Sequence, residues 1–311
     1  MGNFISFMKD VAEGLQSSGN FGTAHVYKSS LNAIIAFNGG ETLSFRKVTR
    51  TFLKKYEGYL RGKDCSWNTV STYLRTLRAV YNRAVDQQLA PYVPHHFRYV
   101  YTGTRADRKC ALEKEEMELL MKKIPANACA KIGDLRRTRA LFFLMFFLRG
   151  IPFVDLAYLK KRDINGNVLT YRRRKTGRML TVTLVPEALK LIEQYMDTDS
   201  SSPYLFSLIK SEEGSEAAYK EYQLALRNFN YQLTILKEVL GLTANISSYT
   251  PRHTWATLAY YCEVHPGIIS EAMGHSSINV TETYLKPFKN KKIDEANVKV
   301  ISSLGAIGRL R

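Results

Sequence analysis

Apolar side chains recur at helical spacing along almost the whole sequence, and residues 163–185 depart from this pattern. The clearest helical segment spans about 68–89, where apolar residues follow one another every three or four positions: Val70, Leu74, Leu77, Tyr81, Ala84 and Val85. Within 180–184 apolar residues alternate with threonines, which is the period of a strand. Asn165-Gly166 and Lys175-Thr176-Gly177 are typical of turns between strands. The sequence therefore predicts a mainly α-helical fold with one small three-stranded antiparallel β-sheet.

Two domains are expected from the length of 311 residues and from a break in the helical pattern after about residue 90. Residues 90–110 contain two prolines, a glycine and several basic side chains, and we interpret them as a linker. We therefore place a helical domain at 1–104. A second, mostly helical domain that contains the sheet and a C-terminal helix is placed at 105–311.

The chain is strongly basic, with 45 Lys and Arg against 28 Asp and Glu and a formal net charge of +17. The excess is present in both predicted domains. Two basic domains favour an extended polyanion such as double-stranded DNA over a small acidic ligand. The alternative is a soluble protein whose basic side chains only form a solvated surface.

Several other classes of protein are disfavoured. The four cysteines are widely spaced without a CxxC pair, and the six histidines form no HExxH motif, so neither a disulfide framework nor a metal site is indicated. The longest apolar run, Ala140 to Leu148, is far shorter than the roughly 20 residues that cross a bilayer. The N-terminus lacks the pattern of a signal peptide. We expect a cytoplasmic protein that needs no cofactor and no metal.

Three motifs in the second half carry the functional signal. Met273-Gly274-His275-Ser276-Ser277-Ile278 is followed by Tyr284, nine residues after the histidine. Arg252-His253-Thr254-Trp255-Ala256-Thr257 lies upstream, and Lys175 occupies the predicted hairpin turn. Together these motifs resemble the catalytic half of the tyrosine recombinase or integrase family, over residues 112–288. The first hundred residues more loosely resemble the helical core-binding (SAM-like) domain of that family.

The resemblance implies a DNA strand-transfer reaction. Tyr284 would be the nucleophile, Arg252 would hold the phosphate with its planar fork, His275 would donate to a nonbridging oxygen, and Lys175 would be the general acid. Each of these residues is also common in structural roles, and it is their order and spacing together that favour the catalytic interpretation. A phosphotyrosine link conserves the energy of the phosphodiester bond, so the reaction would need neither ATP nor a metal.

Two positions depart from the family pattern. In Gly150-Ile151-Pro152-Phe153-Val154-Asp155-Leu156 a proline stands where the family has its first catalytic arginine. We assign that role to Arg149, although Arg149 could instead end a helix. Other arginines compete for the role: Arg136, Arg137, Arg139, Arg172, Arg173 and Arg174. The second departure is Tyr249, three residues before Arg252, which is a poor base at neutral pH. Both departures resemble the recombinases of mobile elements and the DNA invertases of anaerobic gut bacteria.

Further basic residues are candidates for DNA binding. Arg75 and Arg78 lie off the apolar stripe of their predicted helix, where they either contact phosphates or form a solvated face. The other candidates are Arg105, Arg173 and His253. The family resemblance implies that the two domains form a C-shaped clamp around DNA.

The resemblance also implies an assembly. Four protomers would act on two DNA sites and exchange strands through a Holliday junction, with integration, excision or inversion as the outcome. A C-terminal apolar stripe, namely Ile293, Ala296, Val300 and Leu304, would pack on its own domain or dock on a neighbouring protomer. The alternative function is that of a non-catalytic DNA-binding accessory or regulatory protein on the same fold.

Overall fold

The computed structural model describes residues 2–105, 110–122, 124, 135–288 and 290–303. The chain divides into two compact units. The first comprises Met1–Asp107 together with Glu212–Tyr219, and the second comprises Arg108–Ser211 and Lys220–Arg311. The sequence analysis did not assign the short segment 212–219 to the first unit.

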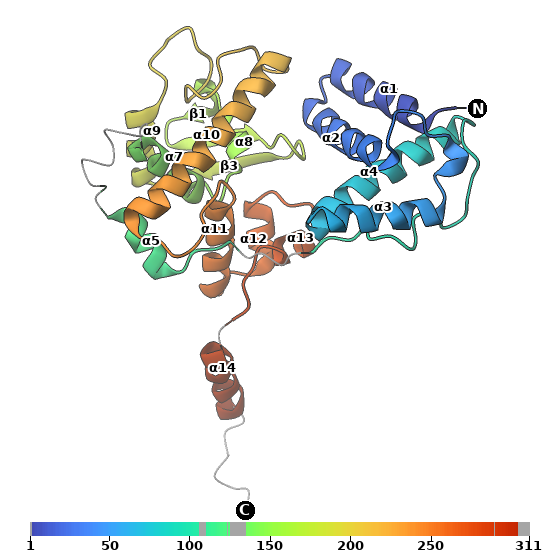
Figure 1. Cartoon of the computed structure of the whole chain (residues 1–311). Coiled ribbons are helices and arrows are strands. Elements are labelled where there is room, and N and C mark those ends of the chain that lie inside the picture. Colours follow the sequence, from blue (N-terminus) through green and yellow to red (C-terminus); the bar gives the residue numbers. More distant parts are fainter. Residues whose placement is uncertain (1, 106–109, 123, 125–134, 289, 304–311) are drawn as a thin grey trace, which may run out of the picture. The chain divides into compact units, whose positions relative to one another are not determined.

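The described residues form α-helices, two short 3-10 helices and one β-sheet (Figure 1). This confirms the predicted fold class, a mainly helical chain with a small antiparallel sheet. In chain order the elements are α1 (Phe4–Ser17), α2 (Phe21–Asn38), η1 (Phe45–Lys47), α3 (Arg50–Gly62), α4 (Trp67–Asp86), α5 (Lys114–Met121), α7 (Leu135–Phe147), α8 (Phe153–Ala157), η2 (Lys161–Asp163), β1 (Ile164–Asn165), β2 (Val168–Arg172), β3 (Met179–Thr183), α9 (Pro186–Tyr195), α10 (Glu216–Leu240), α11 (Thr250–Tyr261), α12 (Pro266–Ala272), α13 (Ile278–Glu282) and α14 (Asn290–Ser303).

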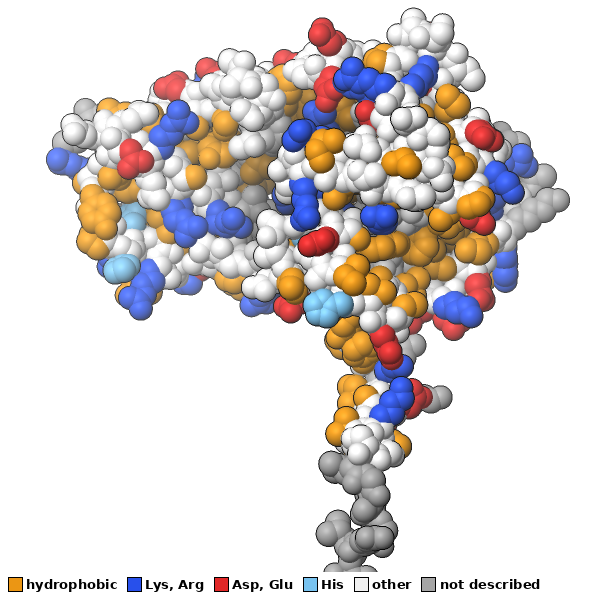
Figure 2. Space-filling view, turned by 180° about the vertical axis from the view of Figure 1, so that it is seen from behind, with side chains coloured by type: hydrophobic (Ala, Val, Ile, Leu, Met, Phe, Trp, Pro, Cys, Tyr) orange, Lys and Arg blue, Asp and Glu red, His pale blue; other side chains and the backbone are white. Residues whose placement is uncertain are grey.

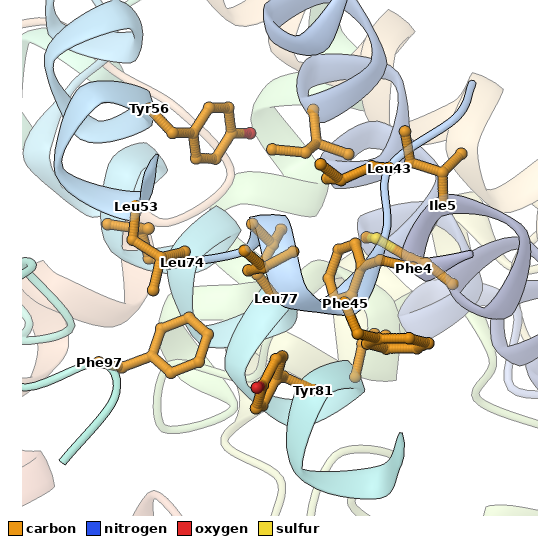
Figure 3. Packing of buried hydrophobic residues seen from close by; sticks show 14 of the residues in the cluster. Phe4, Ile5, Leu43, Phe45, Leu53, Tyr56, Leu74, Leu77, Tyr81 and Phe97 are labelled. Atoms are coloured by element: carbon orange, nitrogen blue, oxygen red, sulfur yellow. The ribbon is translucent and has the colours of Figure 1, made fainter. Parts of the chain in front are cut away.

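The first unit is built around α4, whose apolar stripe is buried as its spacing predicts (Figure 3). Leu74 and Leu77 are fully buried and pack with residues from α1, α3 and the segment before η1. Helix α4 begins at a well-formed cap, because the side chain of Ser66 accepts a hydrogen bond from the backbone N–H of Thr69 at 3.1 Å. The stripe leaves the opposite face of α4, with Arg75 and Arg78, exposed to solvent.

The predicted linker is partly wrong, because residues 90–105 belong to the first unit. Phe97 and Val100 are buried in its core. The backbone of 101–105 is then fixed by polar side chains of α3 and α4: Glu57 accepts from the N–H of Tyr101 at 2.7 Å, Ser71 donates to the carbonyl of Gly103 at 2.6 Å, and Asn68 bonds both backbone groups of Arg105. The prolines and glycine of this segment interrupt the helical period and so suggested a linker, but apolar side chains of the same segment are buried in the core.

The second unit contains the sheet, in the order β1-β2-β3 with antiparallel pairing. Strands β2 and β3 pair from Val168 with Thr183 to Arg172 with Met179, and the turn between them carries Lys175. Helix α7 is buried over most of its length and packs against α9 and α11. Helix α11 also packs against α12, and α12 against α13, so the Arg252 motif and the segment from Met273 to Tyr284 come together in this unit.

Helix α14 is the last described element of the second unit (Figure 1). Apart from Lys292, whose ammonium pairs with Glu263 at 2.9 Å, its residues with a described burial are exposed. Leu304, the last member of the predicted C-terminal stripe, lies outside the described residues. Within the described part of the chain, every helix is too short or too polar to cross a membrane.

Candidate active site

The centre of the candidate site is the buried guanidinium of Arg252, on the first turn of α11. Its Nη1 donates to the carbonyl of Gly150 at 2.6 Å, and its Nη2 donates to the carbonyl of Met273 at 2.9 Å and contacts Nε2 of His275 at 2.6 Å. Its Nε is buried and has no hydrogen-bond partner among the described residues. A buried donor without a partner is rare in native proteins, and here it indicates a place for an acceptor that the chain does not supply.

Glycine at position 150 allows this arrangement. Arg149 and Gly150 both have positive φ, 58° and 69°, and end the helical segment of α7 by turning the chain toward α11. A Cβ at position 150 would lie 2.8 Å from the Cα of Arg252, closer than packed atoms allow. Gly150 therefore lets the end of α7 approach the backbone of α11 and offer its carbonyl to the arginine.

His275 is a neutral imidazole with an assignable tautomer. Because an arginine can only donate, Nε2 of His275 must accept the hydrogen bond from Arg252. Nδ1 therefore carries the proton and donates to Oγ1 of Thr281 at 2.8 Å. Burial, followed by the charges of Arg252, Arg173 and Lys175, lowers the pKa of His275 to about 3. In this state Nε2 is an acceptor, whereas the sequence analysis expected His275 to donate.

A second arginine, Arg173 at the end of β2, is also buried in the site. Its Nη1 donates to the carbonyls of Met273 at 3.0 Å and Gly274 at 2.8 Å, so Arg173 and Arg252 share the carbonyl of Met273. Its Nε lies 3.5 Å from a carboxylate oxygen of buried Asp155. Burial first and the charge of Arg173 second lower the pKa of Arg252, which reflects two guanidinium groups held close together.

Gly274 gives this second arginine its space. Its φ is +64°, and a Cβ there would lie 2.8 Å from Cδ of Arg173 and 3.0 Å from Leu180. Glycine is therefore needed at position 274 both for the turn and because a side chain there would collide with Arg173 and Leu180. Asp155 is the acidic partner of Arg173. Burial raises the pKa of Asp155, while the hydrogen bond from the N–H of Arg174 and the charge of the Arg173 guanidinium lower it.

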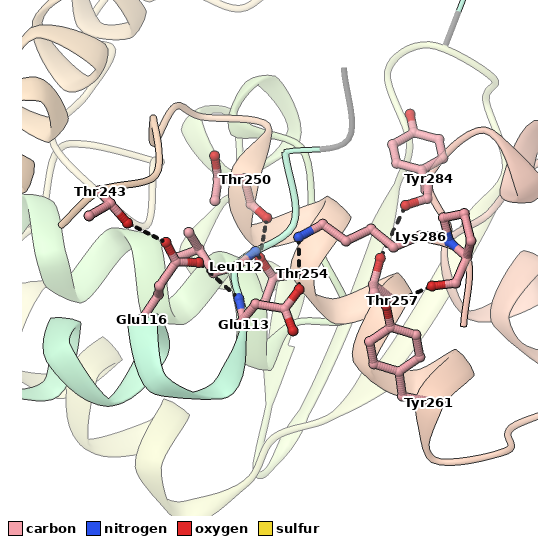
Figure 4. A network of polar contacts seen from close by, with 11 residues as sticks. Leu112, Glu113, Glu116, Thr243, Thr250, Thr254, Thr257, Tyr261, Tyr284 and Lys286 are labelled. Carbon is pink, nitrogen blue, oxygen red and sulfur yellow. Dashed lines mark hydrogen bonds and ion pairs between the residues drawn. The ribbon is translucent and has the colours of Figure 1, made fainter. Parts of the chain in front are cut away.

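Tyr284 lies against these groups. Its ring stacks on His275 with centroids 5.0 Å apart and packs against His253 at 4.6 Å, and the guanidinium of Arg252 is 5.4 Å from its centroid. The backbone carbonyl of Tyr284 accepts a hydrogen bond from Thr257 at 3.2 Å (Figure 4). The structure therefore brings Tyr284, Arg252 and His275 together, as well as Arg173 and His253, which the sequence analysis had treated as DNA contacts.

The remaining predicted residues take different positions. Lys175 is exposed in the β2–β3 turn, and its charge contributes to the low pKa of His275. Tyr249 is exposed immediately before the first turn of α11. Arg149 is half-buried, and its Nη1 donates to the carbonyl of Thr181 in β3 at 3.2 Å. Arg75, Arg78 and Arg105 are exposed in the first unit.

Family models identify the chain. The model of the phage integrase family matches residues 110–291, and that of the phage integrase SAM-like domain matches residues 3–99. The chain belongs to the phage integrase family of tyrosine recombinases. Tyrosine recombinase XerA of Pyrococcus furiosus is 25% identical to it over 236 residues, which cover 73% of this chain and 72% of that protein.

Solved structures of other integrases share the fold of this family member. The Tn1549 transposon integrase in complex with transposon right end DNA superimposes with a TM-score of 0.66 at 14% identity, covering 97% of this chain and 99% of that one. A λ integrase tetramer bound to a Holliday junction gives a TM-score of 0.65 at 15% identity, covering 92% and 78%. Within the described part of this recombinase, no group of acidic, histidine or cysteine side chains could hold a metal ion.

The low pKa of His275 predicts a pH-dependent stability. The unfolded chain takes up a proton at the usual pKa of 6.5, while the folded ring stays neutral down to about pH 3. The contribution of neutral His275 is therefore fully present above pH 6.5 and is lost as pH falls from 6.5 toward 3. We expect the thermal unfolding midpoint to fall less over this window in His275→Gln than in the wild type. Parallel curves for the two proteins would contradict the buried neutral imidazole.

Proposed function

We propose that the chain is a site-specific DNA recombinase that cuts and rejoins strands through a covalent 3′-phosphotyrosyl link to Tyr284. The observation that carries the proposal is the position of the Tyr284 ring, between two imidazoles and 5.4 Å from the buried guanidinium of Arg252. A phenol beside a buried cation with an unpaired donor is suited to attack a bound phosphate.

The reaction follows from these groups. The Tyr284 oxygen bonds to phosphorus, the bond from phosphorus to the 5′ oxygen breaks, and Lys175 gives a proton to the leaving 5′-hydroxyl. The Tyr284 proton goes to water, because Nε2 of His275 already accepts the hydrogen bond of Arg252 and burial lowers the pKa of that ring in the DNA-free protein. A 5′-hydroxyl of the partner strand then attacks the phosphotyrosine and gives its proton back to Lys175, while the bond from phosphorus to the Tyr284 oxygen breaks and the phenol regains a proton from water. This restores the phosphodiester, so the energy of the bond is kept.

We infer that Arg173, rather than Arg149, replaces the first catalytic arginine of the family. Arg173 is buried, shares the carbonyl of Met273 with Arg252 and is paired with Asp155. Arg149 is bonded to the backbone of β3 and has no hydrogen bond or ring contact with Arg252, His275 or Tyr284 among the described residues. Two guanidinium groups against one carboxylate leave a net positive charge, which stabilises the charge that develops on the nonbridging phosphate oxygens.

DNA binding by the first unit is supported by a basic face of α4. A hollow of about 440 Å³ between α2 and α4 contains the two arginines predicted to bind DNA, Arg75 and Arg78. Its other lining residues are Tyr27, Thr72, Thr76, Ala79 and Asn82. Arginine and asparagine side chains commonly contact the phosphates and base edges of DNA. Arg105, fixed against α4 by Asn68, adds a further cation to this unit.

We propose that α14 docks on a neighbouring protomer within a tetramer on DNA. Apolar side chains are exposed along α14 (Figure 2), including Ile293, Val298 and Val300 at 53%, 61% and 64%. A short helix with an exposed apolar surface needs a partner to be stable in water. This supports exchange between protomers over packing on its own domain. The assembly is consistent with strand exchange through a Holliday junction, and whether it leads to integration, excision or inversion depends on the arrangement of the DNA sites.

The first test is covalent capture of DNA. When the protein is incubated with a nicked recognition site, we expect an SDS-resistant protein–DNA adduct from the wild type and none from Tyr284→Phe, with DNA affinity unchanged. Tyr231→Phe, which alters an exposed tyrosine of α10, is the matched control and should react normally. An adduct from Tyr284→Phe would refute the proposal. A wild type that binds the site but forms no adduct would favour the non-catalytic accessory function.

The second test compares the two arginines. Arg173→Lys keeps the positive charge beside Asp155 but loses the planar fork, and we expect cleavage to slow by about 10²–10³, the typical effect of losing one preorganised donor. Arg149→Ala should stay within about threefold of the wild type, because the rate depends on Arg173. Folding and DNA affinity are checked for both by thermal unfolding and titration. A large loss in Arg149→Ala with little effect of Arg173→Lys would reverse the assignment.

A further inference from the structure

One face of α11 contacts the segment that carries the nucleophile at three successive turns. His253, Thr257 and Tyr261 are spaced by four residues, so they share a face of the helix. The ring centroid of His253 lies 4.6 Å from that of Tyr284. Thr257 donates to the carbonyl of Tyr284 at 3.2 Å, and Tyr261 donates to the carbonyl of Pro287 at 3.1 Å (Figure 4). The same helix carries Arg252 next to His253.

The tyrosine segment has a further attachment. The ammonium of Lys286 lies 3.0 Å from a carboxylate oxygen of Glu113, the residue that caps α5. Helix α13, which precedes Tyr284, has only five residues and cannot orient the segment by its own rigidity. Contacts with α11 and Glu113 therefore supply the order that the local helix does not.

We propose that this face of α11 is a cradle that positions Tyr284 for attack, with His253 as a positioning residue for the ring and Thr257 and Tyr261 as positioning residues for the backbone. The proposal rests on the proposed function. It assigns His253 to the nucleophile of its own protomer instead of to DNA. Because Arg252 lies on the same helix, the cradle fixes the distance between the phosphate-binding guanidinium and the attacking phenol.

The physical effect is preorganisation. A side chain that samples several rotamers attacks only from the one that is in line with the leaving group, and a misplacement of about 1 Å costs up to about 10² in rate. The imidazole rings of His253 and His275 both contact the phenol ring, with centroid distances of 4.6 and 5.0 Å. The hydroxyl of Tyr284 is left to react, since the cradle contacts its ring and its backbone.

The test measures the rate of adduct formation in a single turnover, with protein in saturating excess over nicked DNA. His253→Ala removes the ring contact and should slow the reaction by about 10- to 100-fold. His253→Phe keeps a ring at the same place and should remain within about threefold of the wild type. The double variant Thr257→Val/Tyr261→Phe, which removes two hydroxyls, should be slowed by at least about tenfold. Tyr260→Phe is the control, because it also removes a tyrosine hydroxyl from α11. The ring of Tyr260 stacks on Phe288.

A second substrate separates positioning from acid catalysis. With sulfur in place of the bridging 5′ oxygen, the leaving thiolate needs no proton donor, because a thiol has a pKa of about 8.5. This substrate should restore most of the rate lost in Lys175→Ala but none of the rate lost in His253→Ala. A merely structural role would instead lower DNA affinity or the unfolding midpoint of His253→Ala.

The outcomes are distinct. Equal losses in His253→Phe and His253→Ala would overturn the cradle, because the imidazole would then act chemically or on DNA. Wild-type rates in His253→Ala and in the double variant would overturn it as well, as would a loss confined to affinity. If Tyr284→Phe still forms the adduct in the same assay, the proposed function fails. If only Tyr284→Phe is inactive, the function stands and the cradle alone is wrong.

Discussion

The buried guanidinium of Arg252 is the group around which the second unit is organised. Burying a charge is costly unless it is paired and hydrogen-bonded, and Arg252 is bonded to neutral acceptors, namely two carbonyls and a neutral imidazole. The buried carboxylate of Asp155 pairs instead with Arg173. The site therefore holds more positive than negative charge and keeps a buried donor unpaired. A phosphate group of DNA would both neutralise the excess positive charge and accept a hydrogen bond from the unpaired donor.

The acceptors of this guanidinium come from the ends of helical segments. Gly150 follows α7, and Met273 is the residue that caps α12, where carbonyls lack partners within their helix. Their partial negative charge favours a cation. Glycines at 150 and 274 permit the close approach, because a side chain at either position would collide with Arg252 or Arg173. Helix termination, backbone conformation and the placement of the two buried guanidinium groups are thus parts of one arrangement.

Much of this could be predicted from the sequence. Periodicity indicated the helices and the sheet, and the resemblance of the motifs to the tyrosine recombinase family implied that Arg252, His275 and Tyr284 share one site, where the structure shows them in contact. Arg173 was predicted as a DNA contact and as one of several arginines competing for the catalytic role, and strand alternation carried the signal that it is buried: Leu169, Tyr171 and Arg173, which directly follows β2, are buried, while Arg172 is exposed. The docking of residues 90–105 depends on tertiary contacts that local propensity does not encode. The contact between the rings of His253 and Tyr284 likewise joins residues that are 31 positions apart in the chain.

The central claim is that Tyr284 forms the bond to DNA. The most direct measurement is to trap the adduct on a nicked site, digest the DNA with nuclease and the protein with protease, and locate the remaining nucleotide by tandem mass spectrometry. The account predicts a nucleotide 3′-phosphate on the hydroxyl of Tyr284, in the peptide that follows Arg252. A nucleotide on any other of the 19 tyrosines, or on a serine, would contradict it.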